Sequence, residues 1–243
     1  MTNAGKWLSF IALGASVLAV LSGPVAAGPA IKVINPTFNF GKTLQHVSVT
    51  HDFWIKSVGD QPLVITKVVP GCGCTKAPLR DSVLAPGDST VLSITFSTRS
   101  YAGKITKKPY LLTNVSDERV PLTLQVEVMI DPEMAAPLKI SPFEIKITPP
   151  DKQQHRRAAI LIENRGERDL SLSMVSQPRG LFQASLPTVI KAGETAEATV
   201  VVEKKYAGQE FEKSFTFQIS DPERTRYSIP VSCLLEVAGS AGQ

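Results

Sequence analysis

The sequence predicts an all-β protein built from two tandem immunoglobulin-like antiparallel β-sandwiches that follow a signal peptide. Two observations lead to this prediction. Short segments in which apolar and polar residues alternate are separated at regular intervals by turn signals such as Val58-Gly59-Asp60 and Ala85-Pro86-Gly87-Asp88. After its first thirty residues the chain also repeats itself at an offset of about a hundred residues, the size of one domain.

The N-terminal segment has the pattern of a secretory signal peptide. Lys6 is followed by an apolar run from Trp7 to Leu21, and Val25-Ala26-Ala27 provides a small-residue cleavage site. We therefore expect residues 1–27 to be removed, which leaves no stable membrane span and places the mature protein in the periplasm or outside the cell. An uncleaved anchor is the alternative, since about 15 apolar residues approach the minimum for a span.

The first sandwich is predicted for residues 31–131. Its clearest strand runs from Val120 to Ile130, where every second residue is apolar, and Leu92, Ile94 and Phe96 show the same alternation. A period of two puts one face of a strand in the core and the other in water.

A short linker, residues 132–137, is bracketed by Pro132 and Pro137, so we expect it to restrict the two domains to a semi-rigid rod or a bent pair. The second sandwich is predicted for residues 138–238, with alternation at Phe215, Phe217 and Ile219 and a disordered tail at 239–243. The repeat is visible in three matches: Gly59 with Gly166, Gly87 with Gly193, and Tyr101-Ala102-Gly103 with Tyr206-Ala207-Gly208.

Only the first copy carries Cys72 and Cys74, because the second has Arg179 and Leu181 in their places. The fold therefore does not require the two cysteines. Three interpretations remain open: a disulfide within the motif, a soft-metal site, or inert packing. An extended backbone separates such residues by about 6.5 to 7 Å between Cα atoms, the limit of disulfide geometry, so a bridge here would be reducible. A metal site would bind copper or zinc, with His46 or His51 as additional ligands.

The other titratable residues suggest no chemistry. Cys233 falls on the apolar face of the last strand and is expected to be a buried small side chain. His46 and His51 are expected on the solvated surface. No nucleophile motif, phosphate-binding loop or paired-acid pattern occurs, so we expect no enzyme and no cofactor other than copper. The formal net charge of +4 is spread along the chain, which excludes a clustered nucleic-acid footprint.

The first copy resembles a bacterial family of uncharacterised secreted domains recognised by a Cys-Gly-Cys-Thr motif, which is itself similar to the Hydin and ASH group of immunoglobulin-like domains. The resemblance covers residues 36 to 130 and depends on these segments: Phe40-Gly41, Ser57-Val58-Gly59, Leu63-Val64-Ile65, Gly71-Cys72-Gly73-Cys74-Thr75, Pro86-Gly87-Asp88, Phe96 and Thr113-Asn114. It implies an immunoglobulin-like fold in the envelope or outside the cell and no established activity.

The leading hypothesis is a non-enzymatic envelope or secreted protein that binds another envelope or extracellular protein through strand edges and loops. The first alternative is a thiol-redox or copper-binding protein that uses Cys72 and Cys74. The second is a periplasmic chaperone, which needs a basic anchor between its domains, with Arg156 or Arg157 as candidates.

Overall fold

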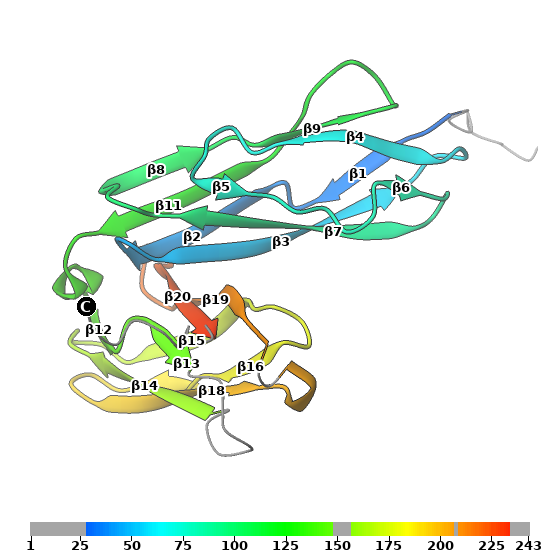
Figure 1. Cartoon of the computed structure of the whole chain (residues 1–243). Helices are drawn as coiled ribbons and strands as arrows, with labels where there is room; N and C mark the ends of the chain where they lie inside the picture. The colour runs from blue at the N-terminus through cyan, green and yellow to red at the C-terminus, as the bar shows by residue number, and fades with distance from the viewer. Residues whose placement is uncertain (1–27, 148–156, 207–208, 234–243) are drawn as a thin grey trace, which may run out of the picture.

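A computed structural model describes residues 28–147, 157–206 and 209–233. It contains two β-sandwiches connected by a short 3-10 helix, η1 (Pro132–Ala135) (Figure 1). The expected signal peptide and C-terminal tail lie outside these residues. Within the described part of the chain no helix is both long and apolar enough to cross a membrane.

The first sandwich is made of three sheets. Its sheets have the strand orders β1-β3-β7-β5, β10-β9-β4-β6 and β2-β11-β8. The bounds are β1 (Ile31–Ile34), β2 (Thr37–Leu44), β3 (Ser48–Ser57), β4 (Leu63–Val69), β5 (Thr75–Lys76), β6 (Val83–Leu84), β7 (Ser89–Ser97), β8 (Gly103–Lys107), β9 (Tyr110–Thr113), β10 (Val120–Pro121) and β11 (Thr123–Met129).

The strand predicted from Val120 to Ile130 is divided in two. Val120 and Pro121 pair with β9, whereas the chain from Thr123 onward pairs with β2 and β8. The apolar alternation continues through the change of sheet, with Leu122, Leu124, Val126 and Val128 all buried in the first core. A strand that passes from one sheet to the other closes the sandwich, and alternation alone does not reveal such a passage.

The second sandwich has two sheets in place of three. One sheet has the order β12-β14-β18-β16, and the other has the order β17-β15-β19-β20, with β13 paired in parallel to β20. The bounds are β12 (Leu138–Ser141), β13 (Ile145–Ile147), β14 (Arg157–Asn164), β15 (Leu170–Ser176), β16 (Phe182–Ser185), β17 (Val189–Ile190), β18 (Thr195–Val202), β19 (Phe211–Ile219) and β20 (Arg226–Cys233), with a second 3-10 helix, η2 (Lys204–Tyr206).

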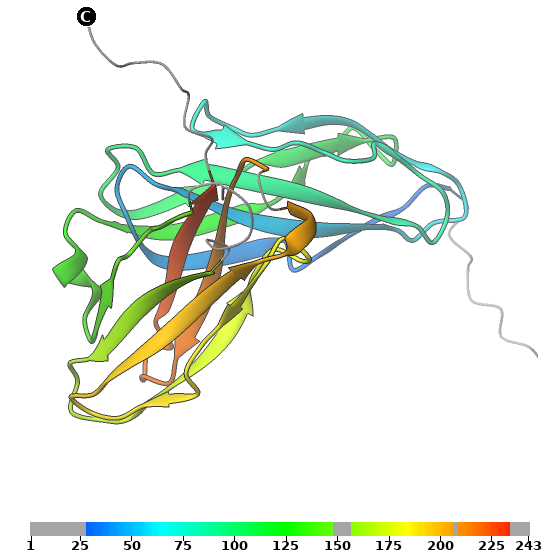
Figure 2. The same cartoon turned by 60° about the horizontal axis from the view of Figure 1, so that its bottom comes forward.

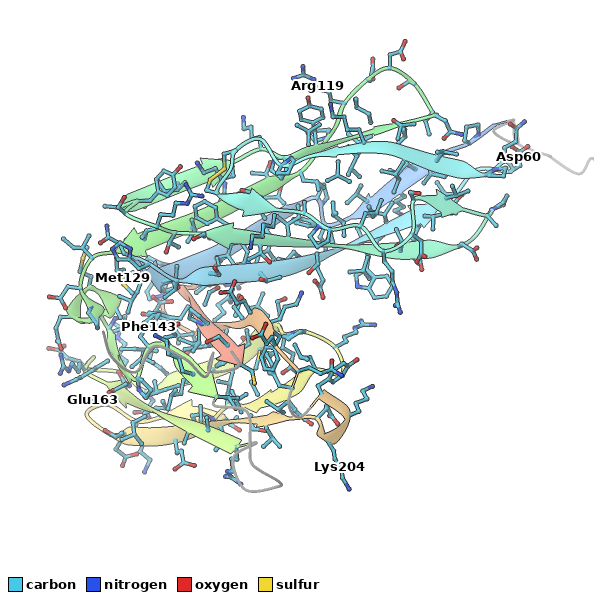
Figure 3. The ribbon with its side chains drawn as sticks, viewed as in Figure 1. Asp60, Arg119, Met129, Phe143, Glu163 and Lys204 are labelled. Carbon is cyan, nitrogen blue, oxygen red and sulfur yellow. A yellow bond between two sulfur atoms is a disulfide. The ribbon has the colours of Figure 1, made fainter. Side chains whose placement is uncertain are left out.

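The two domains form a bent pair in which β19 and β20 pack against β2 and β3 (Figures 1 and 2). One parallel bridge, Lys42 to Tyr227, joins a sheet of each domain into a continuous sheet. Met129, at the end of β11, is buried in the core of the second domain (Figure 3). The domains are therefore joined by packing as well as by the linker.

This contact overturns one expectation for the second copy. Alternation predicted that the polar face of the strand through Phe215 and Phe217 would lie in water, yet Ser214 and Thr216 are only 2% and 1% exposed. β20 is likewise buried at every position from Tyr227 to Cys233. The apolar residues of these strands fill the second core, and their polar face is covered by the first domain.

Candidate functional site

Cys72 and Cys74 are joined by a disulfide in the loop between β4 and β5 (Figure 3). Their Cα atoms are 5.3 Å apart, closer than the extended backbone assumed from the sequence would place them. The reason is a turn: Gly71 has a φ of +84°, and the Thr75 N–H donates to the Cys72 carbonyl oxygen at 3.2 Å. This curved backbone brings the two sulfur atoms together.

The two sulfur atoms have different surroundings. Cys74 is 5% exposed and belongs to the first core, whereas Cys72 is only partly buried. The Tyr101 hydroxyl lies 3.7 Å from Cys74 Sγ, and Lys107 Nζ donates to that hydroxyl oxygen at 3.1 Å. Cys72 Sγ lies 3.3 Å from Thr75 Oγ1. One side of the bridge is thus accessible, and the other is enclosed beside a tyrosine and a cation.

In the second domain, the residues at the positions equivalent to Cys72 and Cys74 make different contacts. β5 and β16 begin at Thr75 and Phe182, so Arg179 and Leu181 occupy the places of Cys72 and Cys74, as the repeat predicted. Leu181 packs against the second core, as Cys74 does in the first. The Arg179 guanidinium instead lies 5.2 Å from the ring centroid of Trp54 in the first domain, a distance typical of cation–π contact.

The contact between the domains is lined by small hydroxyl side chains. Ser214 Oγ accepts from the Thr50 N–H at 2.9 Å and donates to the Thr50 carbonyl oxygen at 3.1 Å. The Ser228 hydroxyl donates to the Phe40 carbonyl oxygen at 2.7 Å, and the Thr43 hydroxyl donates to the Ser228 carbonyl oxygen at 3.0 Å. These bonds satisfy buried backbone groups and thereby define one orientation of the domains.

Both domains donate hydrogen bonds to the backbone of the linker. Lys42 Nζ donates to the carbonyl oxygens of Met134 and Ala136, each at 3.0 Å. The Tyr227 hydroxyl donates to the Ala135 carbonyl oxygen at 2.7 Å, and burial raises the pKa of this hydroxyl above its ordinary value. The linker is consequently part of the packed interface.

His51 lies in this interface, which contradicts the expectation of a solvated side chain. Its ring stacks on Phe38 with centroids 3.6 Å apart, and Nδ1 lies 3.1 Å from Ser176 Oγ of the second domain. Burial lowers the pKa of His51 to about 4, against the opposing effect of Asp52. The second domain covers this ring, and the strand periodicity of the first domain does not predict such burial.

Next to His51 a groove of about 780 Å³ opens between the domains. Its apolar lining comes from Ile34, Trp54, Leu79, Val91 and Val175, and its cations are Arg80, Arg179 and Lys213. Asp52 is the one carboxylate in the lining. Lys213 Nζ lies 3.8 Å from this carboxylate and donates to Ser93 Oγ, so it ties β19 to the first domain while remaining at the groove.

The remaining sequence candidates lie elsewhere. His46 is exposed in the turn between β2 and β3. Among residues 28–147, 157–206 and 209–233, no cluster of three or more His, Cys, Asp and Glu side chains is suited to a metal ion. Arg157 lies on β14 with Glu197 at 3.8 Å and does not line the groove, and Arg156 is outside the described residues. Cys233 is a free thiol in the second core, where burial raises its pKa.

Sequence reasoning missed the groove residues Trp54, Arg179 and Lys213, which come from three separated segments. One signal pointed to the interface that creates the groove. The outward positions of β20 hold Ser228, Pro230 and Ser232, which are small and uncharged where a solvated strand usually carries long polar side chains.

The family described as "Protein of unknown function (DUF1573)" matches residues 31–128, the first domain. No curated protein matches the chain significantly.

The solved structures that match this chain share little sequence with it. A protein of unknown function from Porphyromonas gingivalis W83 is 15% identical over 84% of this chain and 99% of that one, with a TM-score of 0.37. An ASH/PapD-like domain of human CEP192 is 11% identical over 52% and 99% of the respective chains, with a TM-score of 0.36. A structure of IG1 and IG2 of DIP-gamma is 8% identical over 85% of this chain and 98% of that one, with a TM-score of 0.28.

Proposed function

We propose that this protein is a non-enzymatic component of the cell envelope, or a secreted protein, that binds an extended acidic segment of another protein in the groove between its two immunoglobulin-like domains. The observation that carries the proposal is the groove of about 780 Å³, whose lining has both apolar side chains and a surplus of cations. Protein-binding surfaces combine buried aromatic and arginine side chains in this way.

The charges of the groove favour an acidic partner. Arg80, Arg179 and Lys213 face it, and only Asp52 opposes them. Because Arg179 already lies against the Trp54 ring, its guanidinium is held in place before any partner binds. A preordered cation loses less conformational entropy on binding than a free one.

An exposed strand edge favours an extended segment. β1 is the end strand of its sheet, and along the described residues it pairs only with β3. Its last residue, Ile34, lines the groove. A segment that enters the groove can therefore add to β1 through main-chain hydrogen bonds while its acidic side chains meet the cations.

Photo-crosslinking in the native envelope tests the proposal. A photoreactive residue at Arg80 should form an adduct with one protein, whereas the same residue at Leu161 should form none. Leu161 is 52% exposed on β14 and does not line the groove. The partner identified in this way should bind Trp54→Ala at least about tenfold more weakly than wild type, the effect of losing one aromatic anchor, and Leu161→Ala should bind normally.

Arg179→Ala provides a second test, because this exposed arginine can be removed without exposing the core. This variant should also bind the partner more weakly than wild type. The proposal is wrong if position 80 forms no adduct, if both positions capture the same proteins, or if both groove variants bind as tightly as wild type. A partner that is a subunit lacking one strand would make the protein a periplasmic chaperone, a special case of the same binding mode.

A further inference from the structure

The disulfide between Cys72 and Cys74 is not needed to build the domain. In the second domain Arg179 and Leu181 occupy the same positions, and the following strands pair alike, β5 with β7 and β16 with β18. A bridge between residues two apart also closes a very short loop, so it constrains the unfolded chain little. Its presence in one copy alone therefore calls for a chemical explanation.

The surroundings of the bridge are asymmetric in a way that suits thiol–disulfide exchange. Exchange requires an accessible sulfur for the incoming thiolate and stabilisation of the sulfur that leaves. Cys72 is the accessible sulfur, since Cys74 is only 5% exposed. The leaving sulfur, Cys74 Sγ, has the Tyr101 hydroxyl at 3.7 Å.

A cation supports that hydroxyl. Lys107 Nζ donates to the Tyr101 oxygen at 3.1 Å and lies 4.4 Å from the centroid of the tyrosine ring. With its oxygen occupied by this ammonium group, the Tyr101 O–H is directed to donate elsewhere, and Cys74 Sγ is within reach. Hydrogen bonds to charged sulfur from such a polarised donor are strong. Arg99 adds a second positive charge to the loop by donating to the Gly73 carbonyl oxygen at 2.9 Å.

We propose that Cys72–Cys74 is a thiol–disulfide exchange site that accepts two electrons from a protein dithiol, with Tyr101 and Lys107 as positioning residues. This inference is independent of the binding groove. A thiolate of the dithiol attacks Cys72 Sγ and forms a mixed disulfide, while the electron pair of the broken bond leaves on Cys74 Sγ. The second thiolate of the dithiol then attacks the dithiol sulfur that is bonded to Cys72 Sγ. A disulfide forms within the dithiol, and the electron pair of the broken mixed disulfide leaves on Cys72 Sγ.

The two cysteine thiolates take up the two protons that the dithiol loses. The dithiol is thereby oxidised to a disulfide, and Cys72 and Cys74 are reduced to thiols. Cys233 takes no part in either step, because it is buried in the core of the second domain.

The test uses the full-length mature protein and dithiothreitol as the probe. The rate of reduction is followed by acid quenching, alkylation and peptide mass mapping, which separates the pair from Cys233. We expect Tyr101→Phe and Lys107→Gln to slow reduction at least about tenfold, the effect of one charge-assisted hydrogen bond. Lys108→Gln is the matched control, since Lys108 is the exposed neighbour and should leave the rate unchanged.

The site of attack is measured with variants that retain one cysteine of the pair, and peptide mass mapping separates that cysteine from the buried Cys233. The thiol of Cys74→Ser, which retains Cys72, should form a mixed disulfide with an aromatic disulfide reagent at least about tenfold faster than the thiol of Cys72→Ser, a difference expected from its greater exposure. Thermal unfolding of all variants is recorded alongside, because a purely structural effect would change the melting temperature and not the rate. Equal rates for wild type, Tyr101→Phe and Lys107→Gln, or faster reaction at Cys74, would overturn the proposal.

Discussion

The hydroxyl of Ser214 should be one of the groups that hold the two domains together. Ser214→Ala removes the single oxygen that pairs with both the N–H and the carbonyl oxygen of Thr50. β1 pairs with β3 only from Trp54 to Ser57, so at Thr50 this edge of β3 has no neighbouring strand. The Ser214 hydroxyl instead pairs with the backbone groups of Thr50 there. Thr50 is 5% exposed and Ser214 is 2% exposed, which leaves water little access to either group.

The expected loss follows from the number of backbone groups left unpaired. Each buried donor or acceptor without a partner costs about 1–3 kcal/mol, and a water molecule that enters the vacated space restores part of it. We therefore expect Ser214→Ala to lower the free energy of unfolding by about 2–4 kcal/mol, sizes typical of lost buried hydrogen bonds.

Equilibrium unfolding in urea measures this loss, with Ser173→Ala as the matched control. Ser173 is an exposed serine on the neighbouring strand β15, and its hydroxyl lies 3.5 Å from the Gln218 carbonyl oxygen, at the limit of a hydrogen bond. Its replacement should change stability by less than about 0.5 kcal/mol, as is usual for surface positions. If the two variants unfold at the same urea concentration, Ser214 does not close the edge of β3 and the reasoning fails.

Three further perturbations have definite expected outcomes. Gly41→Ala places a Cβ atom 2.1 Å from a carbonyl oxygen of the second domain. It should therefore separate the two domains and raise the radius of gyration measured by small-angle X-ray scattering. Gly87→Ala, with a similar positive φ and no neighbour within 4 Å, should leave that radius unchanged. The pKa of His51 falls from 6.5 to about 4 on folding, so the unfolded chain binds more protons than the folded chain between these pH values. The free energy of unfolding is therefore fully present above pH 6.5 and declines by up to about 3 kcal/mol toward pH 4. Urea titrations of His51→Gln at several pH values should lack this dependence of stability on pH. Joint replacement of Cys72 and Cys74 by serine should cost only about 1–2 kcal/mol, because the loop is short, and the circular dichroism spectrum should stay that of the wild type; loss of the β signal would mean that the bridge is structural after all.

Local pattern was sufficient to predict what depends on neighbours in sequence. Alternation of apolar residues predicted the all-β class, since a strand places every second side chain on one face. The duplicated pattern predicted two sandwiches. It also aligned Arg179 and Leu181 with Cys72 and Cys74, and the starts of β16 and β5 confirm that these positions are equivalent. The pattern around Cys72 and Cys74 left three interpretations open, a disulfide, a metal site and inert packing. Whether the two sulfur atoms meet depends on a backbone turn, which this pattern does not predict.

Tertiary structure alone decided the features that join distant segments. The groove depends on side chains from β3, the loop after β15 and β19, and no periodicity relates such segments. His51 and Ser214 looked like surface residues because each strand was considered against its own core, whereas the second domain buries the other face. The sequence by itself therefore determined two sandwiches with one distinctive cysteine loop, and only the packing of one domain on the other decided which polar residues are buried and where a groove remains, because burial is a property of the assembled surfaces and not of a single strand.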